Sequence, residues 1–149
     1  MLNIEVIKAT LLFEGLSDDA LAFFDSRVII KNYEAGAVIT TEGSLGDSMF
    51  IVKSGLVDVI LNRDSKDMVS IAELSPGDFA GELSLIDSQP RSASLVARQT
   101  TQILTISRTA LLDLHKHDFD AFMKVIVNIT RRIGNRLRET DKILASIAR

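Results

Sequence analysis

The sequence predicts a mainly β domain, folded as a sandwich or barrel, with helices at both ends. Between Val28 and about Ser107, short runs rich in β-branched and apolar residues are separated by Gly, Asp, Asn and Ser, which is typical of antiparallel strands joined by turns. No strand-helix-strand rhythm of about 30 residues is present, so a doubly wound parallel sheet is not expected. On either side of this region, apolar residues recur at helical spacing.

The composition is that of one ordinary globular domain: 149 residues, 46% apolar and 25% charged. A chain of this length can bury roughly 70% of its unfolded surface, so its core needs no disulfide or metal. Cysteine is absent, which excludes thiolate zinc sites and catalytic thiols and fits a reducing compartment. Charged residues interrupt the first apolar segment, and no apolar run reaches about 18 residues. We therefore expect a cytoplasmic protein that is neither exported nor membrane-spanning.

Two short helices are expected before the first strand. Apolar residues recur at helical spacing from about Ile4 to Phe13, which predicts one amphipathic helix that ends at Gly15. Ser17 then stands where its side-chain oxygen can accept a hydrogen bond from the first turn of a second, brief helix. Asp18 follows it and favours the positive end of the helix dipole.

After Thr109 the sequence returns to a helical period. Apolar residues from Phe119 to Leu137 recur every three or four positions and form one stripe that further apolar residues extend. A helix of about 30 residues is roughly 45 Å long, more than a compact domain of this mass can cover. We therefore expect it to pair with the same helix of a second copy in a two-fold homodimer. The alternative is a helix folded back on its own sandwich.

Basic residues gather in the tail from Arg131 to Arg149, a pattern that can mark a nucleic-acid-binding arm. They alternate with apolar residues at helical spacing, so the solvated face of a packed helix is the better interpretation. The sequence predicts no recognition helix after this tail. Specific nucleic-acid binding by this chain alone is therefore not expected.

An insert between Phe79 and Ser94 interrupts the β pattern without forming a hairpin. Gly81 allows a close backbone approach, and the residues after it have helix-forming composition. The start of a short helix presents N–H groups that lack a partner within the helix. Such groups form an anion site when a phosphate lies before them.

Side chains of the insert fit the same ligand chemistry. Arg91, just after Pro90, offers a planar fork that matches two phosphate oxygens, and Ser92 adds a hydroxyl and its own N–H. Glu82 would repel a phosphate unless it accepts a hydrogen bond from a ligand hydroxyl, which indicates a sugar attached to the phosphate. Taken singly, Arg91 would be an exposed turn arginine and Glu82 a residue stabilised by a helix start.

The string FAGELSLIDSQPRSASLVA closely resembles the phosphate-binding cassette of cyclic nucleotide-binding domains. Catabolite-activator-type regulators, protein kinase A regulatory subunits and nucleotide-gated channels share this family. LFEGLSDDAL resembles the family's N-terminal helices, and YEAGAVITTEGSLGDSMFIVKSGLVDVI resembles its glycine-punctuated early strands. GELSLI followed by PRSA behind these strands is a specific combination. The resemblance implies a β jelly roll (double-stranded β-helix) with N-terminal helices, a short phosphate-cassette helix and a long C-terminal helix.

The resemblance covers almost the whole chain and implies one cyclic nucleotide-binding domain over residues 1–149. Residues 1–27 would form the N-terminal helices, and residues 28–108 the jelly roll, with the phosphate-binding cassette at 79–94. Residues 109–149 would form the C-terminal helices, which act as lid and dimerisation element.

The resemblance also implies the roles of individual residues. Glu82 and the backbone of Gly81 are expected to bind the ribose 2′-hydroxyl, and Arg91 the exocyclic phosphate. The other expected contacts are the phosphate cradle of Leu83, Ser84, Ser92 and Ala93 and the apolar base wall of Val59, Ile71 and Ala72.

The base-capping position departs from the family pattern. Bacterial activators carry adjacent hydroxyl residues there, but TRRIGNRLRET places Arg136 and Leu137 at the matching positions. Asn135 and Arg136 are the candidate caps, and Arg136 could meet an acceptor edge such as guanine O6 or adenine N7. Ser92 does not distinguish the bases, since in this family a hydroxyl after the cassette arginine occurs in cGMP binders and in bacterial cAMP binders. We prefer cAMP as the ligand, with cGMP as the alternative.

We therefore expect a regulatory sensor domain, not an enzyme, that binds cAMP and signals through movement of its C-terminal helix. The receiver would be an unknown effector protein or a missing domain. One alternative is a truncated or ligand-free member of the catabolite-activator-type regulators, without their helix-turn-helix domain. The other is a cupin-like enzyme, which needs clustered histidines in the strands. His115 and His117 lie outside the strand region, and neither a metal site nor a cofactor is expected.

Overall fold

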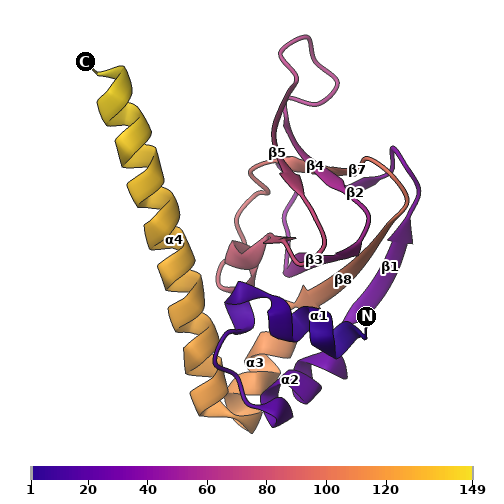
Figure 1. Cartoon of the computed structure of the whole chain (residues 1–149), viewed down its shortest axis with the longest axis vertical. Coiled ribbons are helices and arrows are strands. Elements are labelled where there is room, and N and C mark those ends of the chain that lie inside the picture. Colours follow the sequence, from indigo (N-terminus) through magenta and orange to yellow (C-terminus); the bar gives the residue numbers. More distant parts are fainter. Residues whose placement is uncertain (1, 149) are drawn as a thin grey trace.

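Two four-stranded antiparallel sheets form the centre of the structure, a computed structural model that describes residues 2–148 (Figure 1). One sheet has the order β1-β8-β3-β6 and the other the order β2-β7-β4-β5. The expected mainly β jelly roll with flanking helices is confirmed. The strands are β1 (Ile29–Tyr33), β2 (Val38–Thr40), β3 (Ser48–Ser54), β4 (Val57–Leu61), β5 (Val69–Leu74), β6 (Phe79–Ala80), β7 (Ser94–Ala97) and β8 (Thr101–Ser107).

Helices precede and follow the sheets. The α-helices are α1 (Asn3–Ala9), α2 (Asp18–Asp25), α3 (Arg108–His117) and α4 (Phe119–Ile147), and the short 3₁₀ helices are η1 (Leu11–Phe13) and η2 (Glu82–Leu85). As expected, Ser17 caps α2: its Oγ accepts a hydrogen bond of 3.2 Å from the N–H of Ala20. Within residues 2–148, none of these helices combines the length and the hydropathy needed to span a bilayer.

The prediction of a single helix up to Phe13 is wrong, because helix α1 ends at Ala9 and Thr10 leaves the helical conformation. This buried residue has extended backbone angles, with ψ at 127°. Its hydroxyl donates a 2.9 Å hydrogen bond to the carbonyl of Val6. A threonine side chain that bonds the backbone in this way competes with helix continuation. Residues Leu11–Phe13 therefore form a separate turn, η1.

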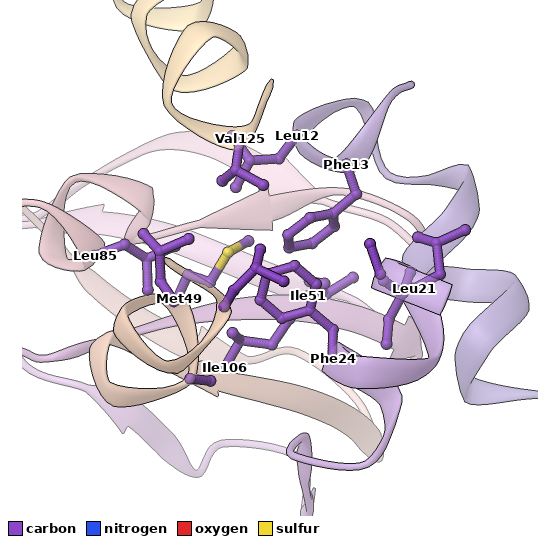
Figure 2. Close-up of a cluster of buried hydrophobic side chains, with 14 of the residues drawn as sticks. Leu12, Phe13, Leu21, Phe24, Met49, Ile51, Leu85, Ile106 and Val125 are labelled. Carbon is purple, nitrogen blue, oxygen red and sulfur yellow. The ribbon is translucent and has the colours of Figure 1, made fainter. Parts of the chain in front are cut away.

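Two apolar clusters form the core, one on each face of the first sheet. Successive strand residues point to opposite faces, so Met49 and Ile51 of β3 face the helices, while Phe50 and Val52 face the second sheet. The larger cluster joins α1, α2, α3 and the first half of α4 to the sheet (Figure 2). Leu85 of η2 belongs to this cluster and is 3% exposed, so the core anchors the cassette.

Helix α4 has buried residues only in its first half. Its 29 residues include three buried ones, Ala121, Val125 and Ile129. Figure 1 shows its C-terminal half running alongside the sandwich and set apart from it. Ile133, Leu137, Ile143, Leu144 and Ile147 are all at least 41% exposed there.

Asn128 fixes the packed half of α4 to the N-terminal segment. Its side-chain amide donates to the carbonyl of Leu12 at 2.9 Å and to the carbonyl of Glu14 at 3.0 Å. The position of α4 therefore depends on residues more than a hundred positions away in the sequence.

Candidate functional site

The insert predicted between Phe79 and Ser94 brings the backbone of Gly81 close to the side chain of Arg91. Gly81 has φ of 81° and lies between β6 and η2, as the N-cap residue of η2. A Cβ atom at Gly81 would lie 2.6 Å from Nη1 of Arg91. Glycine is therefore required here for two reasons, the left-handed backbone and the closeness of the guanidinium.

The guanidinium of Arg91 is held by fixed hydrogen-bond partners. Nη1 donates to Oγ of Ser84 at 2.8 Å, and Nη2 donates to the carbonyl of Ser48 at 2.8 Å. Its carbon lies 4.9 Å from the ring centre of Phe50. Nε is buried and has no hydrogen-bond partner within the described residues. A buried, unpaired donor on a cation indicates a place for an anionic acceptor.

Burial lowers the pKa of Arg91, and the negative charge of Asp47 partly opposes this effect. The group stays a cation at neutral pH because arginine is not deprotonated in proteins. The site therefore presents a permanent positive charge that is only partly solvated.

Gly46 makes room for this guanidinium. A Cβ atom at Gly46 would lie 2.2 Å from the Cζ atom of Arg91. The sequence predicted only a turn at Gly46, because no local pattern connects this residue with Arg91, which lies 45 positions later. Its structural role is to leave space for Arg91.

Glu82 supplies a buried carboxylate to the same part of the structure as Arg91. The residue is 1% exposed, and Oε1 lies 3.0 Å from Nη1 of Arg136 and 3.9 Å from Nε of Arg132. The contact with Arg136 is an ion pair, but Oε1 accepts no hydrogen bond of good geometry within residues 2–148. A carboxylate has about four lone-pair positions, so Glu82 can still accept hydrogen bonds from ligand hydroxyls.

A cavity of about 300 Å³ lies beside Arg91. Its walls come from β4, β5, the cassette and α4. A second cavity of about 110 Å³ adjoins it, and both share Gly81, Arg91, Ser92 and Arg136. Apolar walls with a few convergent polar groups are typical of small-molecule sites.

The structure brings most of the predicted site residues together. Glu82 and its neighbours Leu83 and Ser84 line the smaller cavity. Asn135 lies outside both cavities and lines a separate one between η1 and α4. Arg136 also lines that third cavity, but of the two candidate caps only Arg136 reaches the cavities beside Arg91. The predicted residues that line the larger cavity are Val59, Ile71, Ala72, Gly81, Arg91, Ser92, Ala93 and Arg136.

Arg132 was not predicted as a site residue. It lines the larger cavity, and its guanidinium carbon lies 4.8 Å from the ring centre of Phe79. Arg132 precedes Arg136 by four positions, and residues at this spacing share one face of a helix. That spacing could have identified it. The other cavity residues that the sequence did not indicate include Thr40, Phe50, Leu74 and Leu95.

Both histidines make aromatic contacts. His117 stacks on Phe23 with ring centres 4.7 Å apart, and His115 meets the rings of Phe119 and Phe122 edge to face. In the described part of the chain, no group of three or more His, Asp or Glu residues is placed to hold a metal ion.

Comparison with known proteins adds a family match. The family model described as "Cyclic nucleotide-binding domain" matches residues 30–118. The "Cyclic AMP receptor protein" of Thermus thermophilus is 34% identical over 139 residues, which is 91% of this chain. The chain spans 61% of that relative's length and smaller shares of other curated relatives, down to 10%.

Solved structures give the same result. The Thermus thermophilus Catabolite Activator Protein superposes with a TM-score of 0.81 and 31% identity, over 93% of this chain and 63% of that chain. A cyclic nucleotide-binding domain from Methylobacillus flagellatus superposes with a TM-score of 0.79 and 30% identity. That match covers 96% of this chain and 81% of the other.

Proposed function

Because the chain belongs to the cyclic nucleotide-binding domain family, we propose that it binds cAMP beside Arg91 and acts as a regulatory sensor, not as an enzyme. Arg91 carries this proposal. Its guanidinium is fixed by Ser84 and Ser48, opens on a cavity of nucleotide-compatible size and keeps a buried Nε without a partner among the described residues. The absence of cysteine supports a cytoplasmic location.

The cyclic phosphate would lie against Arg91. Guanidinium N–H groups match phosphate oxygens in pairs, and such charge-assisted bonds contribute roughly 1.5 to 3 kcal/mol each. Ser92 and Ala93 line the same cavity and add a hydroxyl and backbone N–H groups. The backbone of Leu83 and Ser84 would complete the cradle from η2.

The ribose would lie against Glu82. Its carboxylate would accept a hydrogen bond from the 2′-hydroxyl, with the Gly81 backbone close by. Because the carboxylate is buried, a lost partner is not replaced freely by water, and the contact favours ligands that carry the hydroxyl.

The base would lie against Val59, Ile71 and Ala72. These side chains offer apolar contact but no hydrogen-bond pattern, so they accept purines with little selectivity. Arg136 lines the same cavity and can donate to N7 of adenine. Asn135, which faces another cavity, is not part of this proposal as a base cap.

Ligand occupancy would be transmitted through α4. Arg132 and Arg136 both lie on this helix, and both approach Glu82. A ligand that binds Glu82 changes the contacts that hold the helix, and a coupling of about 1 to 3 kcal/mol is usual for such linkage.

The exposed apolar half of α4 supports a homodimer through this helix. The same stripe that packs near Val125 continues to Leu144, which is 58% exposed, and no other element within residues 2–148 covers it there. We place the signal's receiver in an effector protein or a further domain, since the curated relatives are longer than this chain.

Isothermal titration calorimetry with cAMP, cGMP and 5′-AMP tests the proposal. We expect cAMP to bind the wild type. The Arg91→Leu substitution should lower the affinity for cAMP about 100-fold, equivalent to about 2.7 kcal/mol of binding free energy. Arg63→Leu is the matched control, because Arg63 pairs with Asp64 in the β4–β5 loop and not with the site. Equal affinity of wild type and Arg91→Leu would refute the phosphate assignment. A wild type that binds none of the three would indicate a ligand-free member of the family.

A second titration tests the ribose contact. Removal of the 2′-hydroxyl from cAMP should weaken binding to the wild type more than binding to Glu82→Ala, because the variant has already lost the acceptor. Equal losses in both proteins would exclude Glu82 from the ribose site.

A further inference from the structure

Arg108, the first residue of α3, joins two segments that surround Arg91. Its Nε and Nη2 donate to the carbonyl of Ser84 at 2.9 and 2.6 Å, and Nη2 also lies 3.4 Å from the carbonyl of Gly46. Its own backbone N–H donates to the carbonyl of Asp47 at 2.7 Å. One residue of α3 is therefore bonded both to η2 and to the segment before β3.

Arg91 bridges the same two segments from the cavity side. It bonds Oγ of Ser84 in η2 and the carbonyl of Ser48 at the start of β3. Ser84 thus lies between two guanidinium groups, one on its hydroxyl and one on its carbonyl. Unlike Arg91, Arg108 does not line either cavity of the site.

We propose that Arg108 is a positioning residue for the cyclic nucleotide, acting through Ser84 and Arg91; this inference rests on the proposed function. The place of the Ser84 hydroxyl depends on its backbone, and that backbone is fixed by Arg108. The Ser84 hydroxyl in turn accepts the hydrogen bond that orients Arg91. Loss of Arg108 would free Ser84 to move and would leave the Arg91 guanidinium without this fixed partner beside the phosphate.

The guanidinium geometry is necessary for this role. Two nitrogens of Arg108 converge on one carbonyl while Nη2 also approaches a second carbonyl. A lysine ammonium is a point charge without this planar fork. Arg108→Lys should therefore restore only part of the affinity that Arg108→Gln loses.

Calorimetry with cAMP on a double-mutant cycle tests the inference. Arg108→Gln should lose about tenfold or more in affinity. Arg27→Gln is the matched control, because Arg27 pairs with Asp113 of α3 at 3.7 Å and has no bond to the cassette. Its affinity should stay within about twofold of wild type.

The cycle separates positioning from general loosening. If Arg108 acts through Arg91, the variant carrying both Arg91→Lys and Arg108→Gln should bind about as weakly as Arg91→Lys alone. If the affinity loss of the double variant equals the product of the two single-variant losses, Arg108 acts independently of Arg91, and the inference is overturned. So would wild-type affinity in Arg108→Gln.

Amide hydrogen exchange gives a readout that needs no ligand. The N–H of Ser84 bonds the Gly81 carbonyl, and the N–H groups of Ile86 and Asp87 bond the Leu83 carbonyl. Arg108→Gln should speed exchange at these amides, whereas Arg27→Gln should not. Unchanged exchange in Arg108→Gln would overturn the inference. If the wild type binds no cyclic nucleotide, the proposed function fails, and the exchange rates still decide whether Arg108 holds the cassette.

Discussion

Gly46→Ala should weaken ligand binding while leaving the fold intact. The new Cβ would lie 2.2 Å from Cζ of Arg91, and ordinary contact begins at 3.4 Å, so the guanidinium must move by about 1.2 Å. The bonds from Arg91 to Ser84 and Ser48 are each 2.8 Å long. A displacement of this size lengthens at least one of them beyond hydrogen-bond range.

The expected effects on affinity and stability follow from the same displacement. Each charge-assisted hydrogen bond contributes roughly 1.5 to 3 kcal/mol, so affinity for cAMP should fall at least about tenfold. The displaced atoms belong to the end of a flexible side chain, and Gly46 does not have a left-handed φ. The free energy of unfolding should therefore fall by no more than one such bond contributes, about 1.5 to 3 kcal/mol, and the fold should persist.

Calorimetry with cAMP and urea unfolding measure the two effects. Leu45→Ala is the matched control, because Leu45 is the preceding residue of the same loop and is 74% exposed. Its affinity and stability should equal those of the wild type. Undiminished cAMP affinity in Gly46→Ala would show that the place of Arg91 does not determine binding and would refute this reasoning.

Three further predictions concern the fold and the assembly. Gly55→Ala should lower the free energy of unfolding by about 2 kcal/mol or more in urea titration, because φ is 98° and the new Cβ would lie 2.6 Å from the Thr100 carbonyl oxygen. A wild-type midpoint would contradict this. Asn128→Leu should lower the free energy of unfolding by about 1 to 3 kcal/mol, because the carbonyls of Leu12 and Glu14 lose their hydrogen-bond donor. An unchanged thermal unfolding temperature would contradict this prediction. Leu137→Glu should convert a dimer to a monomer in light scattering, and a monomeric wild type would exclude the dimer.

Local sequence patterns predicted the β region and the helices well, because both depend on the spacing of apolar residues. The runs around Met49 and Leu104 became the central strands β3 and β8. Strand β6 was not predicted, because Phe79–Ala80 is too short to show a period. The break at Thr10 was also missed, since it depends on one side-chain hydrogen bond to Val6 rather than on periodicity.

The candidate site was predicted where its residues are close in sequence. Glu82 and Arg91 belong to one insert, and their chemistry alone indicated a sugar phosphate. Gly46 and Arg108 approach Arg91 and Ser84 from distant parts of the chain, so no local pattern could place them there. The four-residue spacing to Arg136 could have identified Arg132. For the two candidate caps, helix geometry decides which residue faces the cavity.

A crystal structure of the protein with cAMP tests the central claim most directly. The exocyclic phosphate oxygens should lie within hydrogen-bond distance of the Arg91 guanidinium, including its Nε, and Glu82 should accept a hydrogen bond from the ribose 2′-hydroxyl. Nucleotide bound at another place, or an Arg91 guanidinium turned to solvent at saturating cAMP, would contradict the account.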